Sequence, residues 1–267
     1  LAEGLFLPIN PSETIKICMD KILTMNRLKE AGHPVMRFVK IYELDDLKDI
    51  DYFPVVLKPS VSSGASANSF IAQDDEELRC FANYLLKFSD FFIAQEYIGT
   101  PDDEYTVGVL NDMQGNIINS IAVKRNILSS LSNKIKIPNR TGRKELGSVL
   151  AISSGISQGE IGSFPEVTSQ CEEIAKAVNS CGPLNIQCRY VNGKVYTFEI
   201  NPRFSGTTSL RSMVEFNEPD MLIRKHVLGE DIQPYFSYKH GTILRGLNEV
   251  FISNQNKYNI KTHKCCA

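Results

Sequence analysis

The sequence lacks the features that mark several large functional classes. No apolar run approaches the ~20 residues that a membrane-spanning helix needs, and no segment resembles a secretory signal peptide. The formal net charge is −2, whereas a protein that holds nucleic acid by its phosphate backbone needs a basic excess. We therefore expect neither a membrane nor a nucleic acid as a partner.

The seven cysteines and four histidines form no pattern typical of a metal centre. Cys171, Cys181 and Cys188 are too far apart for a CxxC pair, and His33 precedes Pro34 in a predicted turn. The cysteine count is odd, and the spacing does not indicate a disulfide framework. We expect reduced thiols in a cytoplasmic protein, without a zinc site or a Ser-His-Asp triad.

Helical and strand-like periodicities alternate along the chain, which predicts an α+β protein. A single helix from Pro11-Ser12 to Gly32 comes first, and a break at Gly99-Thr100-Pro101 divides the rest into two lobes. Residues 126–148 are basic and hydroxyl-rich, which indicates a mobile loop. We predict an N-terminal helical segment at residues 1–34 and a small lobe at 35–97 with a flap at 60–67. A large lobe at 98–250 and a weakly ordered tail at 251–267 follow.

The stretch TFEINPRFSG at residues 197–206 alternates polar and apolar residues, as a strand with one wet face does. The strand before it, at 184–190, forms a predicted hairpin with it through Val191-Asn192-Gly193-Lys194. A two-residue Asn-Gly turn would mix apolar and polar residues on both faces. A three-residue loop that pairs Tyr190 with Lys194 separates them, and we expect this register because register follows the buried face.

In the expected register the two faces of the hairpin differ in character. The apolar face holds Leu184, Ile186, Cys188, Tyr196, Phe198 and Ile200. The polar face holds Asn185, Gln187, Arg189, Thr197, Glu199 and Asn201.

The polar face brings the side-chain oxygens of Gln187, Glu199 and Asn201 into one space. Magnesium prefers hard oxygen ligands and is often held by one or two carboxylates together with substrate phosphates. Arg203 follows two residues later and can add positive charge beside a transferring phosphoryl group. The pattern predicts a magnesium site completed by a polyphosphate, although a solvated strand face would show the same alternation.

The first half of the chain holds residues suited to binding phosphate. An apolar strand ends in Lys58 and is followed by small residues from Ser60 to Ala67, whose backbone N–H groups can approach a phosphate closely. This is not a P-loop, because the lysine precedes the loop. Lys21 borders the apolar stripe of the first helix, where it either points into a cleft or snorkels. Together with the hairpin, these residues suggest a nucleotide between two lobes.

The order of these motifs resembles that of ATP-grasp enzymes, in the carbamoyl-phosphate-synthase-like branch of carboxylate–amine ligases. The matching stretches are modest individually but run in the family's order over residues 18–230. They are Asp20-Lys21, Val56-Leu57-Lys58-Pro59-Ser60, Ser62–Ser66, AQEYIG at 94–99, DEYTV at 103–107, Asn185-Ile186-Gln187 and FEINPRFSG at 198–206.

The resemblance implies an α+β ATP-grasp fold with ATP between two lobes and Mg²⁺, or alternatively Mn²⁺, as the metal. Two lysines would contact the α- and β-phosphates, a flap would close over them, a backbone segment would read adenine, and an acid would hold the ribose. The two lysines are Lys21 and Lys58, and the flap holds Ser62, Ser63 and Gly64. The segment that reads adenine is Gln95, Glu96, Tyr97 and Ile98, and the acid that holds the ribose is Glu104.

The resemblance also implies the chemistry. Gln187, Glu199 and Asn201 would hold one or two metal ions, while Asn185 and Arg203 would steady the γ-phosphate. In this family a substrate carboxylate attacks that phosphate and gives an acyl phosphate, which an amine then captures. A small carboxylic acid and a small amine are therefore the implied partners, and positioning in a closed site supplies the catalysis.

The sequence departs from the family pattern in two places, upstream of Lys21 and in the flap. Relatives usually carry an α/β domain before the Asp-Lys helix, but only twenty residues precede Lys21, so we expect that domain to be missing, truncated or on another chain. The flap has one glycine where relatives often have several, which would weaken its hold on phosphate. For the substrate carboxylate we expect the forked guanidinium groups of Arg125 and Arg211.

Three functions fit these residues. The first, which we expect, is an ATP-dependent ligase that forms a C–N bond through an acyl phosphate, with an amino acid or peptide as a candidate substrate. The second is a non-catalytic or partner-dependent ATP-binding module. The third is carbamoyl phosphate formation from bicarbonate and ammonia. The sequence leaves a homo-oligomer open.

Overall fold

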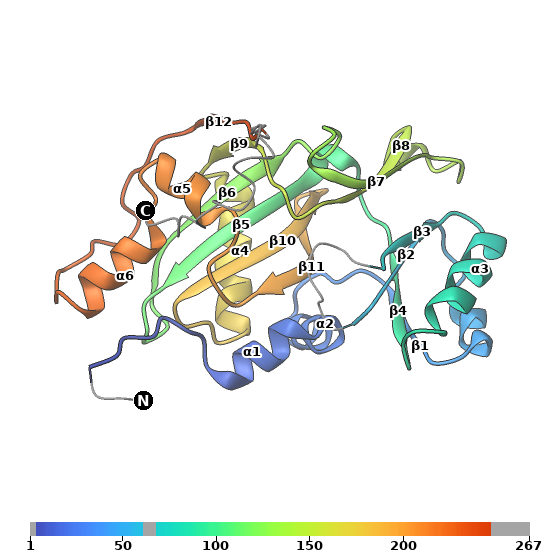
Figure 1. The fold of residues 1–267 in the computed structure, drawn as a ribbon, viewed down its shortest axis with the longest axis horizontal. Coiled ribbons are helices and arrows are strands. Elements are labelled where there is room, and N and C mark those ends of the chain that lie inside the picture. Colours follow the sequence, from blue (N-terminus) through green and yellow to red (C-terminus); the bar gives the residue numbers. More distant parts are fainter. Residues whose placement is uncertain (1–3, 61–67, 247–267) are drawn as a thin grey trace, which may run out of the picture.

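The structure is a computed structural model that describes residues 4–60 and 68–246 of the chain (Figure 1). Two antiparallel sheets and a separate hairpin account for all of its strands. The strands are β1 Phe38–Ile41, β2 Val55–Lys58, β3 Phe70–Ala72, β4 Phe92–Glu96, β5 Glu104–Asn111, β6 Ile117–Arg125, β7 Asn133–Pro138, β8 Val149–Ser153, β9 Gly159–Gly162, β10 Pro183–Val191, β11 Lys194–Asn201 and β12 Gly241–Ile243. The α-helices are α1 Ser12–Met19, α2 Lys21–Glu30, α3 Asp75–Leu85, α4 Pro165–Ala177, α5 Thr208–Met213 and α6 Glu218–His226, and short 3₁₀ turns span Leu44–Asp49, Pro101–Asp103 and Lys144–Leu146.

The small sheet has the strand order β1-β4-β2-β3 and is covered on one face by α3. The helix begins where the Asp74 carboxylate accepts a hydrogen bond from the N–H of Glu77 (2.8 Å). Its apolar stripe, which includes Leu78, packs on alternate strand residues such as Val55 and Leu57. Strand alternation therefore turns Lys58 to the face that α3 leaves uncovered.

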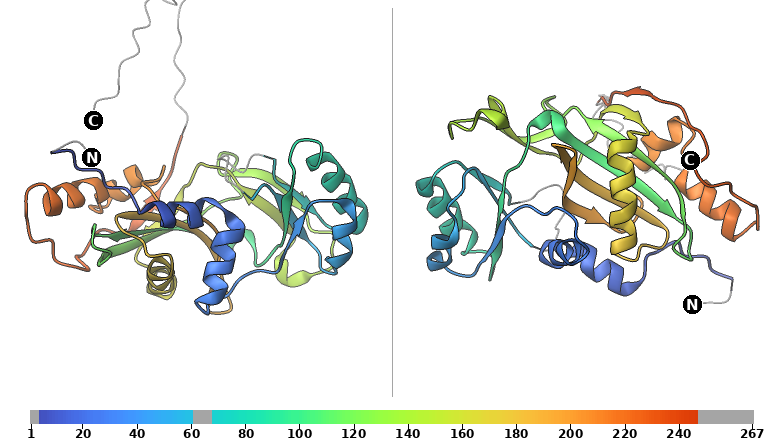
Figure 2. Two further views of the ribbon diagram at one scale, coloured as in Figure 1. Left: turned by 90° about the horizontal axis from the view of Figure 1, so that it is seen from below. Right: turned by 180° about the vertical axis from the view of Figure 1, so that it is seen from behind.

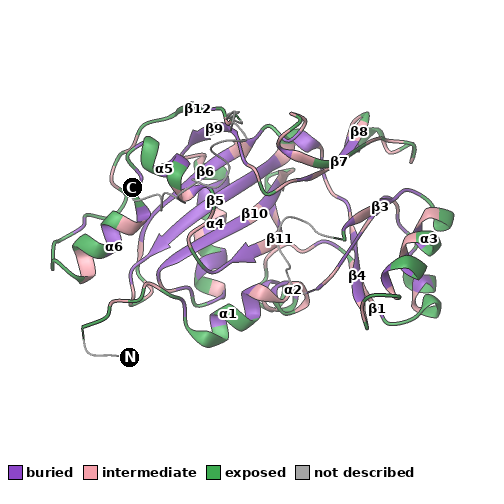
Figure 3. Cartoon of the chain, in the orientation of Figure 1, coloured by how far each residue is buried: buried purple, intermediate pink, exposed green. Residues whose placement is uncertain are grey.

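The large sheet has the strand order β11-β10-β5-β6-β9-β12, and α4 crosses one of its faces, as the view from behind in Figure 2 shows. Val107 and Ile186 on the sheet pack against Val167 and Ile174 on the helix in one apolar cluster. The strands of this sheet are largely buried in Figure 3, while the outer surfaces of α3 and α6 are exposed. The opposite face of the large sheet is therefore the one left for polar side chains of β10 and β11.

Part of that opposite face is covered by α5, α6 and the segment that follows them. Leu110 and Ile121 from the sheet form a cluster there with Leu210, Phe216 and Leu222. No helix among residues 4–60 and 68–246 is both long and apolar enough to cross a membrane.

The predicted first helix is two helices, because the chain is extended at Asp20 (φ −108°, ψ 118°). The Asp20 carboxylate accepts hydrogen bonds from the N–H groups of Ile22 and Leu23 (2.8 and 3.2 Å), so it caps the start of α2. The same carboxylate oxygen accepts a hydrogen bond from the Ser60 hydroxyl (2.7 Å). The single-helix prediction was wrong, and the break is what joins Lys21 to the residues after β2.

The prediction of a mobile loop at residues 126–148 was also wrong, because this stretch contains β7, which pairs with β8. The hairpin reaches the small sheet: Gln73 donates to the Pro138 carbonyl (3.1 Å) and accepts from the N–H of Arg140 (2.6 Å). Leu150 of the hairpin packs with Ile71 of β3 in an apolar cluster. The hairpin therefore fastens the large-sheet half of the chain to the small sheet (Figure 1).

Candidate functional site

The β10–β11 hairpin contains a two-residue turn and a bulge, and not the three-residue loop we expected. Val191 pairs with Lys194, and the turn residues Asn192 and Gly193 have left-handed φ values of 51° and 77°. The register then shifts beyond Cys188, which leaves Phe198 as the extra residue.

The bulge sets which side chains share a face. On its far side Gln187 lies opposite Glu199 and Asn185 opposite Asn201. Cross-strand partners point to the same side of a sheet, so these four side chains share the face away from α4. On the turn side the expected faces of Tyr196 and Thr197 were wrong: Tyr196 lies opposite Arg189 and Thr197 opposite Cys188, because the bulge exchanges them.

Hydrogen bonds orient the polar groups on this face. The Asn201 amide donates to Oε1 of Glu199 (3.0 Å), and its Oδ1 accepts from Nη2 of Arg203 (3.4 Å). Arg203 is exposed and also donates to the Phe204 carbonyl (2.8 Å). The structure therefore brings Gln187, Glu199, Asn201 and Arg203 together, with the carboxylate and the arginine at either side of Asn201.

Two lysines of the first half of the chain reach this face. Nζ of Lys58 lies 3.5 Å from the Phe198 carbonyl, across the gap between the two sheets. Burial, followed by the nearby Lys21 charge, lowers the pKa of Lys58 to about 7, and the Glu199 charge opposes this shift. Burial likewise lowers the pKa of Lys21, and the negative charges of Glu199 and Asp20 oppose this shift. The site therefore contains two crowded cations and one nearby carboxylate, an environment that favours a polyanion.

The start of the predicted flap is fixed to α2. The N–H and Nζ of Lys21 both donate to the Ser60 carbonyl (3.1 and 3.4 Å). The predicted flap residues Ser62, Ser63 and Gly64 lie outside the described residues.

Glu104, the predicted ribose ligand, lies buried between two arginines. Its Oε1 accepts from Nη1 of Arg125 (2.9 Å), and its Oε2 accepts from Nη2 of Arg189 (3.4 Å). Arg125 also donates to the Ser153 hydroxyl and to the carbonyls of Ser154 and Ile156 (2.9–3.0 Å). Both of its terminal nitrogens are therefore engaged, and the expectation that Arg125 presents a free fork to a substrate carboxylate is corrected to a structural ion pair.

Arg211, the other expected carboxylate contact, is fully buried and also engaged. It donates to Glu218 (2.9 Å) and to Oδ1 of Asn185 (2.7 Å). A Cβ atom on Gly108 would lie 2.4 Å from the Arg211 guanidinium, so the absence of a side chain on β5 makes room for it. The structure thus corrects this expectation too: Arg211 orients Asn185, whose Oδ1 also accepts from the Thr106 hydroxyl (3.0 Å).

The segment predicted to read adenine joins the two sheets. The N–H groups of Glu96 and Tyr97 donate to the Arg37 and Pro54 carbonyls (2.8 and 3.1 Å), so they are used within the small sheet. Gln95 is buried and Ile98 is half-buried.

Arg189 holds this junction together, a role that the sequence reasoning missed. Its guanidinium donates to the carbonyls of Ile98 (2.9 Å) and Ala151 (3.1 Å) and lies 4.2 Å above the Tyr97 ring. Strand parity had placed Arg189 on the correct face, but its partners come from distant segments that no local pattern relates.

The chain is similar to known proteins in sequence and in fold. A family model described as "ATP-grasp in the biosynthetic pathway with Ter operon" matches residues 143–249. The chain is also 27% identical over 209 residues to the carbamoyl phosphate synthase large chain of Thermoanaerobacter sp. (strain X514), which covers 75% of this chain. The matched part of the chain is therefore similar to ATP-grasp proteins. The chain spans only 18% of the synthase relative's length.

Solved structures show the same ATP-grasp fold. An L-amino acid ligase from Bacillus licheniformis covers 87% of this chain with a TM-score of 0.58 and 19% identity, over 55% of its own length. The biotin carboxylase domain of the Hydrogenobacter thermophilus 2-oxoglutarate carboxylase, complexed with Mg-ADP, ADP and bicarbonate, covers 88% with a TM-score of 0.59 and 18% identity, over 50% of its own length.

The ATP-grasp fold implies a magnesium ion, and the donor set on the hairpin fits one. In the described part of the chain no group of three or more His, Cys, Asp or Glu is arranged to hold a metal. Gln187, Glu199 and Asn201 instead offer hard oxygens with a single carboxylate, a set that suits Mg²⁺ when phosphate oxygens complete the coordination.

Proposed function

We propose that this chain is an ATP- and Mg²⁺-dependent ligase that activates a carboxylate as an acyl phosphate and joins it to an amine. The observation that carries the proposal is the meeting of two groups across the gap between the sheets. Gln187 and Glu199 lie opposite each other on one side, and Lys58 approaches the carbonyl of Phe198, the residue before Glu199, from the other. A magnesium nucleotide needs this combination of oxygen ligands and cations.

The phosphates of ATP would lie between the lysines and the hairpin. Lys21 and Lys58 would contact the α- and β-phosphates, whose negative charge opposes both the burial and the Lys21 repulsion that lower the Lys58 pKa. The flap residues Ser62, Ser63 and Gly64 would close over the polyphosphate from their anchor at Ser60.

Adenine and ribose would lie toward the junction of the two sheets, along Gln95, Glu96, Tyr97 and Ile98 and beside Glu104. Both oxygens of Glu104 accept hydrogen bonds from arginines, so the orientation of the carboxylate is fixed. A carboxylate oxygen has more than one lone pair, so Glu104 can accept ribose hydroxyl hydrogens while it keeps both ion pairs.

Gln187, Glu199 and Asn201 would hold Mg²⁺, and Mn²⁺ would suit the same oxygens. The bound ion would neutralise charge on the phosphate oxygens as the γ-phosphoryl group moves. Asn185 would steady that group, since Arg211 and Thr106 fix the orientation of its amide. Arg203, exposed beside Asn201, would supply the positive charge.

The proposed reaction has two steps. A carboxylate oxygen of the acid attacks the γ-phosphorus, the bond to the β,γ-bridging oxygen breaks, and ADP leaves. The amine nitrogen then attacks the acyl carbon, inorganic phosphate leaves, and the nitrogen loses a proton to give the amide. Exclusion of water from the closed site protects the acyl phosphate between the steps.

An amino acid is the acid we propose first, because the solved L-amino acid ligase shares this fold over most of the chain. A carbamoyl-phosphate-type activity is the second candidate, favoured by the sequence similarity to a carbamoyl phosphate synthase large chain. The test is ADP release from Mg-ATP by the purified chain, with a pool of amino acids or with bicarbonate and ammonia. Release that requires an amino acid supports the first, and release that requires only bicarbonate supports the second. Nucleotide binding without turnover in either mixture would contradict both.

A further inference from the structure

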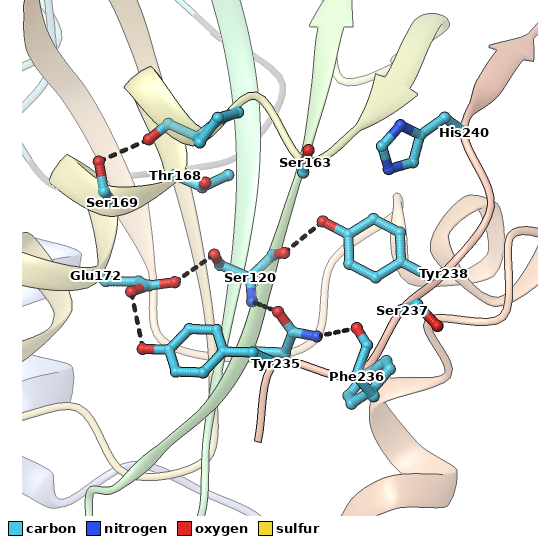
Figure 4. A pocket seen from close by; sticks show the side chains of 12 residues that line it. Ser120, Ser163, Thr168, Ser169, Glu172, Tyr235, Phe236, Ser237, Tyr238 and His240 are labelled. Atoms are coloured by element: carbon cyan, nitrogen blue, oxygen red, sulfur yellow. Dashed lines mark hydrogen bonds between the residues drawn. The ribbon is translucent and has the colours of Figure 1, made fainter. Parts of the chain in front are cut away.

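A cavity of about 380 Å³ lies on the α4 side of the large sheet, away from the nucleotide face (Figure 4). Ser120 of β6 is at its floor, Glu172 of α4 forms one wall, and the segment Tyr235–His240 forms the other. Ser120 pairs with Val109, which packs under α4, so the cavity and the hairpin residue Glu199 are on opposite faces of the sheet. The volume is within the range of small-molecule sites.

The wall formed by Tyr235–His240 is held in place by β6. The N–H of Tyr235 donates to the Ile118 carbonyl (2.8 Å), and Asn119 donates to the Phe236 carbonyl (2.8 Å). The Tyr238 hydroxyl donates to the Ser120 carbonyl (2.7 Å). The cavity is therefore formed before any ligand arrives.

Several hydroxyl groups around the cavity use their hydrogens on the protein itself. Ser120 and Tyr235 donate to the two oxygens of Glu172 (2.5 and 3.2 Å), and Ser169 donates to the Pro165 carbonyl (2.6 Å). Burial and the Glu172 charge raise the pKa of Tyr238 to about 12, so its hydroxyl also remains a donor to the backbone. The oxygens of these groups are consequently left with acceptor lone pairs for a ligand.

The charge around the cavity is negative. Glu172 is the only Asp or Glu among the lining residues, and none of the described lining residues is a lysine or arginine. The lysines near the cavity along the chain form ion pairs with other carboxylates: Lys176 pairs with Glu173 (2.6 Å) and Lys239 with Glu215 (2.5 Å). The Lys176 charge also acts on Glu172 and Tyr235, so its pairing with Glu173 moderates and does not remove its effect on the cavity. The rings of Tyr235, Phe236 and Tyr238 add electron-rich faces, which attract cations.

We propose that this cavity is a second binding site, for a small organic cation whose ammonium or guanidinium group donates to Glu172 and the surrounding hydroxyl oxygens. A cation with several N–H donors matches a site that offers acceptors, one carboxylate and aromatic faces. The proposal is independent of the function proposed for the nucleotide face.

The test is a calorimetric titration of the full chain with agmatine, putrescine and L-arginine, with L-citrulline, whose ureido side chain is uncharged, as the matched analogue of arginine. We expect saturable binding of the cations and at least tenfold weaker binding of citrulline than of arginine, since the ureido group loses the charge-assisted hydrogen bonds that the guanidinium makes. Glu172→Gln should weaken cation binding by about tenfold or more. Glu173→Gln, one residue away on the outer face of α4, should leave the affinity within about twofold, because an exposed charge contributes little.

A second pair of variants locates the site and guards against a folding defect. Tyr235→Phe keeps the ring, removes one hydrogen bond to Glu172, and should weaken binding less than Glu172→Gln does. Glu199→Ala, on the nucleotide face, should leave cation binding unchanged. Absence of saturable cation binding, equal affinity for citrulline, or loss of binding in Glu199→Ala rather than in Glu172→Gln would overturn the proposal.

Discussion

Gln187 lies directly opposite Glu199 across the β10–β11 ladder, and this relationship depends on the bulge at Phe198. With the two-residue turn alone, the register at the turn would place Glu199 opposite Ile186, which belongs to the apolar core. The extra residue shifts the distal half of the hairpin by one position and moves Glu199 to the polar face. The bulge therefore produces the oxygen-rich surface on which the proposed magnesium site rests.

Lys58 should make the stability of the nucleotide-free chain depend on pH. Its folded-state pKa of about 7 is below its ordinary value of 10.5, so between these values the unfolded chain binds more protons. The free energy of unfolding should therefore rise as the pH increases from 7 towards 9, and the destabilisation should be complete below pH 7. Replacing the lysine with an apolar side chain, Lys58→Met, should remove this dependence and raise the free energy of unfolding at pH 7 by up to about 4 kcal/mol.

Urea unfolding at pH 7, 8 and 9 measures this effect. Lys48→Met is the matched control, because Lys48 is exposed and its ion pair is with exposed Asp45. The assignment of a strained buried cation is wrong if Lys58→Met and Lys48→Met show the same pH dependence. Lys58→Met should also weaken ATP binding, even though it stabilises the chain.

Glu104→Gln should destabilise the chain strongly. The substitution removes the carboxylate between Arg125 and Arg189 and leaves two buried guanidinium groups without their counter-charge. Breaking a buried ion pair from one side costs about 3–5 kcal/mol. The expected result in urea unfolding is a loss of that size, whereas Glu173→Gln, which removes an exposed ion pair, should cost less than about 1 kcal/mol.

A double variant separates the charge effect from general damage. Arg125→Met combined with Glu104→Gln removes one of the two stranded cations, so the double variant should lose less stability than the sum of the two single variants. Strict additivity would indicate that Glu104 and Arg125 do not form a coupled pair.

Gly108→Ala should displace the Arg211 side chain that orients Asn185. The new Cβ would lie 2.4 Å from Nη1 of Arg211, and the buried guanidinium has no solvent to move into. Overpacking of this kind costs about 1–3 kcal/mol and should displace Arg211 from Asn185. Thermal unfolding should show a lowered midpoint. Gly206→Ala should leave the midpoint unchanged, because no described atom beyond its two chain neighbours lies within 4 Å of the added Cβ. Equal midpoints for the two variants would refute the close packing at Gly108.

The fold and the metal-ligand candidates could be predicted because they follow from local alternation. Gln187, Glu199 and Asn201 fall on one face in the structure as predicted. Glu199 and Asn201 keep their spacing of two along β11 beyond the bulge, and Gln187 of β10 lies opposite Glu199. The turn itself was predicted wrongly. The alternation of polar and apolar residues determines which face each side chain beyond the bulge occupies, but not where an extra residue is inserted. A third loop residue at the turn and a bulge at Phe198 both satisfy this alternation.

The roles of the arginines could not be predicted, because they depend on partners far along the chain. Arg125 and Arg211 were expected to bind a substrate, and each instead pairs with a buried glutamate, Glu104 or Glu218. Nothing in the sequence near either arginine marks its burial. The β7–β8 hairpin was missed for a related reason: half of the side chains of β7 remain exposed, so its composition resembles that of a loop.

The most direct test of the proposed site is the affinity of ADP for the chain with and without Mg²⁺, compared between the parent and Glu199→Ala. In the parent, Mg²⁺ should tighten ADP binding by about tenfold or more, because Gln187, Glu199 and Asn201 would hold the ion and its charge would offset that of the phosphates. In Glu199→Ala this gain should disappear, while metal-free binding stays equal or improves, since a negative charge near the phosphates is removed. Glu160→Ala, which removes an exposed strand carboxylate on β9, should behave like the parent. If Glu199→Ala keeps the parent's full response to Mg²⁺, the metal is held elsewhere and the proposed site is wrong.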